Sequence, residues 1–278
     1  MARILALTAL AMIAFAANSL LCRLALRDTG IDPASFTLIR MVSGALVLWL
    51  ILRLRAATAT GSRGDWGSAA ALFGYAIAFS YAYVGLSAGA GALLLFGSVQ
   101  ATMILVSLAR GERFTRWQCA GFALAIGGLV ALVAPGATAP PLLAALLMVL
   151  AGMAWGVYSL RGRGNTDPLA TTAGNFLRSV PMAVAAALLA LPWLAADPGG
   201  ALLAVLSGGL ASGVGYAIWY AALRGLSGTA AATVQLSVPA IAALGGVVLL
   251  AEPLSLRLMM ASIVTLGGIA LVIHARRR

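Results

Sequence analysis

Charged residues are scarce in this chain. Only 9% of its 278 residues are charged, and 62% are hydrophobic. A soluble domain carries about 25% charged residues, so seven acids and eighteen bases are too few to cover a water-facing surface of this size. In lipid, only helices and closed barrels satisfy their own backbone groups, and the apolar runs lack the alternation of barrel strands. The composition therefore predicts an all-α membrane protein.

Lysine is absent, because all eighteen basic residues are arginine. This excludes a retinal Schiff base, which needs a lysine. The net charge of +11 would suit nucleic-acid binding, but the arginines occur singly at the ends of apolar runs. A topology signal explains them better, so we expect no nucleic-acid partner. The two cysteines, Cys22 and Cys119, lie in or beside apolar segments and indicate neither a disulfide nor a metal site.

Groups for catalysis are also lacking. The single histidine, His274, stands beside the C-terminal arginines, and all seven acids fall at segment ends or in loops. There is no Ser/His/Asp set and no cluster with metal-ligand spacing. We therefore expect no enzyme activity, no cofactor and no metal.

Ten apolar segments can be drawn, each about as long as the roughly 20 residues that a helix needs to cross a bilayer. Pro/Gly turns separate several of them, and the stretch from Ala134 to Pro141 divides the chain into two halves, 1–134 and 141–278. The segments are 4–22, 33–52, 67–86, 90–108, 116–134, 141–160, 169–192, 200–222, 229–250 and 255–274.

The second half repeats the first at a constant offset of 140 positions. Gly85-Leu86-Ser87 recurs as Gly225-Leu226-Ser227, and Gly127-Gly128 recurs as Gly267-Gly268. Each repeat holds five segments, an odd number, so the second copy must cross the membrane in the opposite direction. Such inverted repeats place a binding site at the bilayer midplane and let it open to either side in turn. Further pairs at this offset are Phe15/Trp155, Ser19/Ser159, Arg23/Arg163 and Glu112/Glu252.

The arginines predict the orientation. Thirteen fall on the side that holds both termini, and three, Arg23, Arg27 and Arg257, fall on the other side. By the positive-inside rule, both termini are cytoplasmic.

No carboxylate lies in the middle of a segment. Proton- and drug-coupled carriers commonly keep an acid inside the bilayer, so its absence disfavours a pump for cationic drugs and favours a neutral or zwitterionic substrate. The segments carry aromatic and amide side chains instead. The candidate substrate-binding residues are Phe15, Asn18, Phe79, Tyr81, Gln100, Trp155, Tyr158, Trp219 and Gln235. The alternatives are that the amides join neighbouring helices by hydrogen bonds and that the aromatic rings only pack.

Three further residues are candidates for gating or structural roles. Arg40 and Arg178 fall inside apolar segments, where an arginine costs about 2.5–3.5 kcal/mol on insertion scales. Each either bonds to backbone carbonyls or a helix end, or anchors a substrate carboxylate. Pro239 is expected to kink the ninth segment, either as a hinge or as a static bend.

The turn at Glu112-Arg113 with Thr115, the sequence Glu252-Pro253-Leu254-Ser255 after Pro239, and the two Gly-Gly pairs resemble the drug/metabolite transporter superfamily, specifically paired EamA-type domains. The match covers the whole chain, and Arg40 after Pro33 fits it too. The first half departs from the pattern at Val99, which stands where the second half has Pro239, so we expect less bending there.

Within the superfamily, the aromatic-rich segments look like amino-acid exporters of the YddG type. That resemblance implies export of amino acids, aromatic ones included, across a bacterial inner membrane by alternating access. We expect a monomer whose partners are the small-molecule substrate and the lipid bilayer. The alternatives are a carrier of drugs or other metabolites, a passive channel, and a membrane enzyme acting on lipids.

Overall fold

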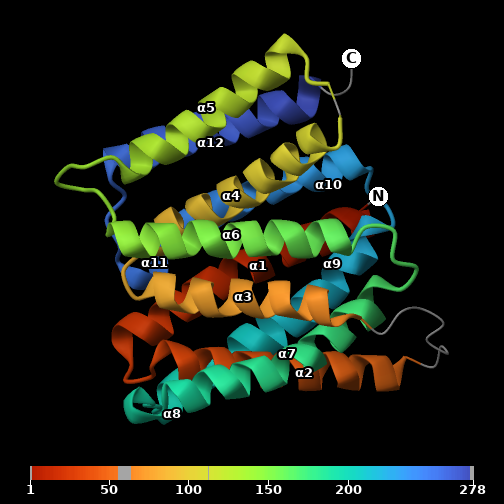
Figure 1. The fold of residues 1–278 in the computed structure, drawn as a ribbon, viewed down its shortest axis with the longest axis vertical. Coiled ribbons are helices and arrows are strands. Elements are labelled where there is room, and N and C mark those ends of the chain that lie inside the picture. The colour runs from red at the N-terminus through yellow and green to blue at the C-terminus, as the bar shows by residue number, and fades with distance from the viewer. Residues whose placement is uncertain (1, 56–63, 112, 276–278) are drawn as a thin grey trace.

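The computed structural model describes residues 2–55, 64–111 and 113–275, and their regular structure is helical throughout (Figure 1). Glu112, Arg63 and Arg276 to Arg278, which entered the arguments above, lie outside these ranges. The first half comprises α1 (Ala2–Asp28), α2 (Pro33–Leu54), α3 (Trp66–Tyr83), α4 (Ala88–Ala109) and α5 (Arg116–Val133). The second comprises α6 (Leu142–Arg161), α7 (Pro168–Leu189), η1 (Leu191–Trp193), α8 (Pro198–Val205), η2 (Leu206–Val214), α9 (Gly215–Leu223), α10 (Gly228–Gln235), α11 (Ser237–Leu250) and α12 (Leu256–Ala275).

The predicted all-α membrane fold is confirmed. In the described residues, nine helical stretches are long and apolar enough to cross a membrane, with α8 to α9 forming one stretch and α10 to α11 another. The one predicted segment that is not among these nine stretches is 67–86, which corresponds to α3. This helix has 18 residues and carries three tyrosines and two serines that lower its hydropathy. It runs beside α6 in the same bundle (Figure 1), and its polar side chains are buried in protein except that of Tyr81.

Acidic N-caps set where several helices begin. Asp32, Asp65, Asp167 and Asp197 each accept backbone N–H groups of the first turn of α2, α3, α7 and α8. An N-cap oxygen satisfies donors that the helix itself leaves unpaired. In three of the four, proline follows the cap, where its fixed φ suits the first helical position.

The two halves run in opposite directions. The chain starts α1 at the end of the bundle that holds both termini and starts α6 at the other end, after the linker that follows α5 (Figure 1). The helix-start caps Ser87 of α4 and Ser227 of α10, which lie 140 positions apart, are used in the same way in both halves.

The last helices of the two halves, α5 and α12, pack against each other through symmetry-related glycines (Figure 1). A Cβ atom on Gly128 would lie 2.3 Å from Thr265 Oγ1 and 2.9 Å from Thr265 N. A Cβ atom on Gly268 would lie 2.5 Å from the carbonyl oxygen of Gly121. Small residues at such contacts let membrane helices approach closely.

Two irregular stretches interrupt the second half. Residues Leu206–Val214 form a π-helix, and a Cβ on Gly208 would lie 2.0 Å from the carbonyl oxygen of Arg40, so this stretch presses against α2. The ninth segment breaks at Leu236, between α10 and α11. Pro239 lies one turn later and has no N–H for the carbonyl of Gln235, which explains the break. The equivalent α4 is uninterrupted, as the Val99 difference predicts.

Adjacent glycines in α5 provide a matched test of the α5–α12 contact. We expect Gly128→Ala to lower stability by about 1–3 kcal/mol, because the added methyl group meets the backbone of α12. Gly127→Ala has nothing within 4 Å and should be neutral or stabilising, because alanine favours helix. Thermal unfolding midpoints of the purified variants in detergent measure both effects, and equal midpoints would contradict the contact.

Candidate functional site

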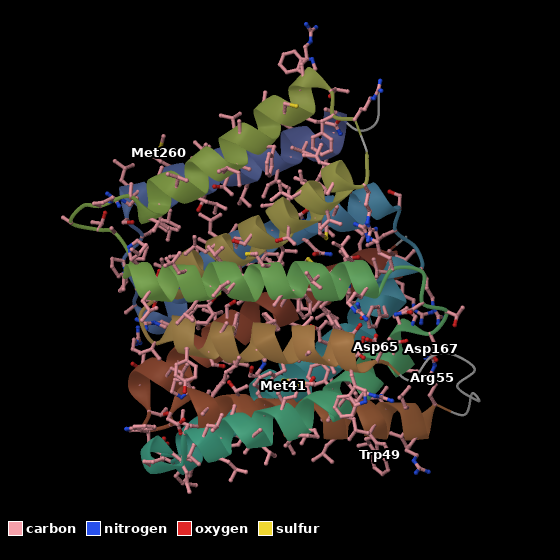
Figure 2. The ribbon with its side chains drawn as sticks, in the orientation of Figure 1. Met41, Trp49, Arg55, Asp65, Asp167 and Met260 are labelled. Carbon is pink, nitrogen blue, oxygen red and sulfur yellow. The ribbon has the colours of Figure 1, made fainter. Side chains whose placement is uncertain are left out.

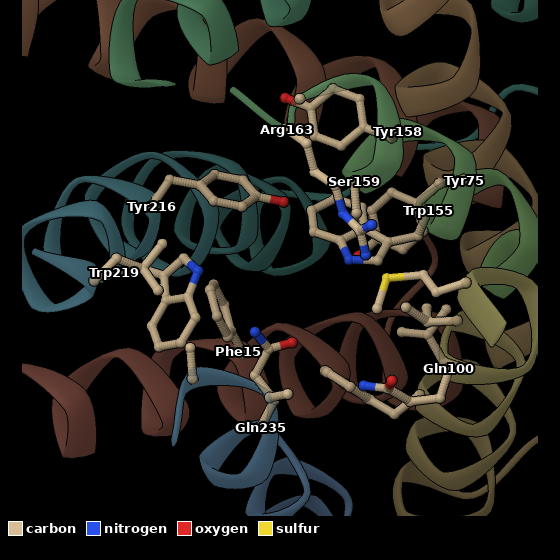
Figure 3. A pocket seen from close by; sticks show the side chains of 18 of the residues that line it. Phe15, Tyr75, Gln100, Trp155, Tyr158, Ser159, Arg163, Tyr216, Trp219 and Gln235 are labelled. Carbon is tan, nitrogen blue, oxygen red and sulfur yellow. The ribbon is translucent and has the colours of Figure 1, made fainter. Parts of the chain in front are cut away.

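A cavity of about 690 Å³ lies between the two halves (Figure 3). It runs from the middle of α1 and α3 toward the ends of α4, α6 and α9 that lie on the side of the termini. The described residues that line it come from every segment that holds a predicted substrate-binding residue, namely the first, third, fourth, sixth, eighth and ninth. The structure adds the start of α5 with Phe114 before it, the first turns of α7 and the last turns of α12.

One wall of the cavity is a cluster of aromatic rings around Trp155. Its ring centroid lies 4.7 Å from that of Tyr75, 5.3 Å from Tyr158 and 5.7 Å from Tyr216, and it stacks on Tyr216 at 20°. Phe15 and Trp219 continue the wall, with centroids 5.9 Å apart in an edge-to-face arrangement. Such rings offer a large, rigid apolar surface to a ligand.

Two amide side chains, Gln100 and Gln235, line the cavity without a hydrogen-bond partner among the described residues. In the view of Figure 3 they lie on the side of the cavity opposite Tyr158 and Tyr216. Neither amide is among the fully buried groups, so both are open to whatever fills the cavity. These two amides are therefore available to a ligand.

Asn18 both joins helices and lines the cavity. Its Nδ2 donates to the Tyr75 hydroxyl at 3.1 Å, and its Oδ1 accepts from the Ser207 hydroxyl at 2.6 Å. It thus ties α1 to α3 and to the π-helical stretch. Of the roles that the sequence left open for the amides, joining helices is observed for this residue, and its place in the cavity wall keeps substrate binding a prediction.

Tyr158 takes part in a chain of hydroxyl groups. It donates to Thr172 at 3.3 Å, and the Thr172 hydroxyl lies 2.8 Å from that of Tyr220. All three residues line the cavity, so this chain connects α6, α7 and α9 along one side of it.

Positions related by the repeat meet at the cavity. Five pairs that stand 140 positions apart contribute both members to its lining. A site at the interface of inverted repeats has this symmetry because the same face of each copy points inward. The pairs are Phe15/Trp155, Asn18/Tyr158, Ser19/Ser159, Phe79/Trp219 and Leu95/Gln235.

Tyr81 is a wrong prediction. Its side chain is 41% exposed on the outside of the bundle and is not part of the cavity wall. Tyr75 and Phe79 lie four residues apart and share a helix face, whereas Tyr81 follows Phe79 by two residues, about 200° around the helix. The other eight predicted substrate-binding residues all line the cavity.

Arg178 does not line the cavity either. Its Nη1 donates to the carbonyl of Gly174, one turn earlier in α7, at 3.1 Å. Of its two predicted alternatives, this geometry matches backbone pairing rather than an anchor for substrate.

Arg40 lies directly behind the aromatic wall. It is 2% exposed, its Nη2 donates to the Tyr75 hydroxyl at 3.0 Å, and its guanidinium sits 5.0 Å from the ring centre of Phe79. Tyr75 and Phe79 separate it from the cavity. The predicted contact with a helix end is absent from its described surroundings.

Charge in the cavity is positive. Among the described residues that line it, Arg163 is charged and no carboxylate is present. Arg40 adds a second positive charge behind the wall. The cavity therefore favours neutral molecules or those with a negatively charged group over cations.

The far end of the cavity is closed by contacts between the halves. Glu252, which follows α11, accepts from Arg23 Nε at 2.9 Å and from the backbone N–H of Ala88 at 2.8 Å. Arg23 also donates to the carbonyls of Tyr83 and Val84. These bonds join α1, α3 and α4 of the first half to the second half. Glu252 thus bonds across the halves, while Glu112, its equivalent in the repeat, lies outside the described residues.

The open end carries its own polar contacts, near Asp65 and Asp167 (Figure 2). Ser68 and then Arg161 hold the pKa of the Asp65 carboxyl well below its usual range, at about 2. The Asp65 N–H donates to Asn175 Oδ1 at 2.9 Å, and Asn175 lines the cavity. The start of α3 is therefore fixed to α6 and α7 at the cavity mouth over the whole physiological pH range.

Sequence reasoning missed several lining residues. Tyr75 and Tyr216 are not among the predicted residues, although Tyr75 lies one turn before Phe79 and Tyr216 lies three residues before Trp219. Helical spacing was therefore the signal that could have found them. The lining residues of α7, such as Thr172 and Asn175, lack such a signal because their repeat equivalents do not face the cavity.

The EamA-like transporter family matches residues 2–134 and 142–274, once in each half. The chain belongs to the EamA-like transporter family. Its members are transporters rather than enzymes, and the match agrees with the resemblance to the drug/metabolite transporter superfamily.

Two similar proteins illustrate how far the likeness extends. "Uncharacterized protein PA1977" of Pseudomonas aeruginosa is 58% identical over 274 residues, which cover 99% of this chain and 96% of that protein. A crystal structure of another protein is 21% identical, with a TM-score of 0.65, and covers 95% of this chain and 98% of its own. At that identity the likeness shows the fold alone.

We expect the three cavity amides to differ in how much their replacement by alanine lowers the stability of the protein. We expect Asn18→Ala to lower stability by about 1–3 kcal/mol, because it leaves Tyr75 and Ser207 without their partner. Gln100→Ala and Gln235→Ala should leave the thermal unfolding midpoint nearly unchanged, since neither amide bonds to described residues. A large drop in either glutamine variant would show that the amide is structural.

Proposed function

We propose that this protein exports amino acids, including aromatic ones, or similar small metabolites across the bacterial inner membrane by alternating access. The observation that carries the proposal is the cavity itself, an aromatic wall facing two unpaired amides with no carboxylate among its described lining residues. Aromatic rings suit an apolar side chain, and amides and hydroxyls suit ammonium and carboxylate groups.

The direction of transport rests on the orientation of the open end. The cavity opens on the side of the two termini, and the arginine distribution predicts that this side is cytoplasmic. An exporter loads its substrate there. The state described here is then the one that accepts substrate from the cell interior.

The closed far end supports a carrier over a passive channel. Glu252, Arg23 and the N-terminus of α4 bond across the halves beyond the cavity. A substrate bound in the cavity can leave on that side only after these bonds break. An inverted repeat offers a second arrangement in which the open and closed ends are exchanged.

Uptake of labelled amino acids into liposomes that contain the purified protein tests this function. We expect saturable uptake that accelerates when the liposomes are preloaded with unlabelled amino acid. A carrier that has released its substrate inside reorients toward the outside faster when it carries another substrate molecule back. Uptake that does not saturate would indicate a channel. Saturable uptake of drugs or sugars but of no amino acid would assign a different substrate class.

Trp155→Ala tests the aromatic wall. Removing this ring takes away the contacts to Tyr75, Tyr158 and Tyr216, so we expect KM for an aromatic amino acid to rise about tenfold or more, an amount typical of a lost buried ring. The lipid-facing Trp49, which is 52% exposed, provides the control, and Trp49→Ala should leave KM unchanged. Unchanged kinetics in the Trp155 variant would remove this residue from the site.

A further inference from the structure

Arg40 is a buried cation without an anionic partner. Its side chain is 2% exposed, and within the described ranges no carboxylate comes within ion-pair distance of it. The Nε and Nη1 atoms have no hydrogen-bond partner in the part of the chain that the structure describes. Two aromatic rings, Tyr75 at 5.2 Å and Phe79 at 5.0 Å, supply cation–π contacts.

Cation–π contacts and one hydrogen bond are weak compensation for a buried guanidinium. Such a group stays charged at any physiological pH and carries five N–H donors. Buried charges are normally paired, because desolvation of an unpaired charge is costly. The positive field of Arg40 is therefore available to an anion that enters from outside the fold.

The Tyr75 hydroxyl connects Arg40 to the cavity. Its oxygen accepts from Arg40 Nη2 at 3.0 Å and from Asn18 Nδ2 at 3.1 Å. A phenolic oxygen has two acceptor sites and one proton, so both acceptor sites are filled and only the proton remains. No described residue accepts that proton, and Tyr75 lines the cavity beside Trp155 (Figure 3).

The surrounding contacts hold this donor in place. Ser207 donates to Asn18 Oδ1 at 2.6 Å, which turns the Asn18 nitrogen toward Tyr75. The Tyr75 ring is packed between Phe79, with centroids 5.3 Å apart, and Trp155. Because two donors, one of them cationic, polarise its oxygen, the Tyr75 O–H is a strong donor whose natural acceptor is an anion.

We propose that Tyr75 and Arg40 form a subsite for the carboxylate of the transported molecule. The Tyr75 O–H donates to the carboxylate, and Arg40 acts through Tyr75 as a positioning residue that supplies the charge. The rest of the ligand lies against the aromatic wall. One carboxylate matches the charge of the single guanidinium that lies behind this wall. The inference rests on the proposed transport of amino acids and specifies what the cavity recognises in them.

The test compares two competitors that differ only at this group. Uptake of labelled phenylalanine into liposomes is inhibited with unlabelled phenylalanine or with phenylalaninamide, which lacks the carboxylate. For the wild-type protein we expect phenylalaninamide to inhibit at least tenfold more weakly. The measured quantity is the ratio of the inhibition constant of phenylalaninamide to that of phenylalanine. In Tyr75→Phe, which keeps the ring and removes the hydroxyl, this ratio should fall at least fivefold, because inhibition by phenylalanine weakens while inhibition by the amide does not.

Tyr83→Phe is the matched control. Tyr83 lies in the same helix, its hydroxyl donates to the carbonyl of Ala88, and it is not part of the cavity wall. We expect it to keep the wild-type ratio. Arg40→Lys retains a charge without the guanidinium fork and should lower the ratio in part; if it does not fold, Tyr75→Phe alone decides the question.

The outcomes separate this inference from the proposed function. Equal inhibition by both competitors in the wild-type protein, or an unchanged ratio in Tyr75→Phe, overturns the carboxylate subsite while amino-acid transport stands. No uptake of phenylalanine and no inhibition of any amino-acid uptake overturns both.

Discussion

The membrane is the constraint on which the rest of this structure depends. Without water in the hydrocarbon layer, each polar group must find its partner inside the chain. Most do, through capped helix starts, hydroxyls bonded to the preceding turn, and the Glu252 contacts between the halves. The exceptions lie in or directly behind the cavity wall, since Gln100 and Gln235 face the cavity and Arg40 Nε and Nη1 are buried behind Tyr75 without a partner among the described residues. The polar groups without a partner and the cavity thus indicate the same candidate site.

Repetition made most of the fold predictable. An offset of 140 positions fixed two halves of five segments each, and an odd number of crossings requires them to run in opposite directions. The bundle has this form, with glycine contacts between α5 and α12 repeated about the pseudo-symmetry. The sequence also indicated the break before Pro239.

The residues that line the cavity were predictable where the repeat, or a polar side chain inside an apolar segment, indicated them, and not elsewhere. Eight of nine selected residues line the cavity, and Tyr81 does not because spacing along a helix, rather than residue type, decides which way a ring points. The sequence could not show that Arg40 lies behind Tyr75, since that depends on the packing of α2 against α3 and on the close approach of Gly208. Tertiary contacts of this kind leave no local pattern in a chain.

A structure of the protein with bound phenylalanine at saturating concentration tests the central claim most directly. The account predicts the amino acid in the cavity, with its ring against Trp155 and its polar groups within hydrogen-bond distance of the amides of Gln100 or Gln235. A ligand bound outside this cavity, or a cavity that remains empty at saturation, would contradict it.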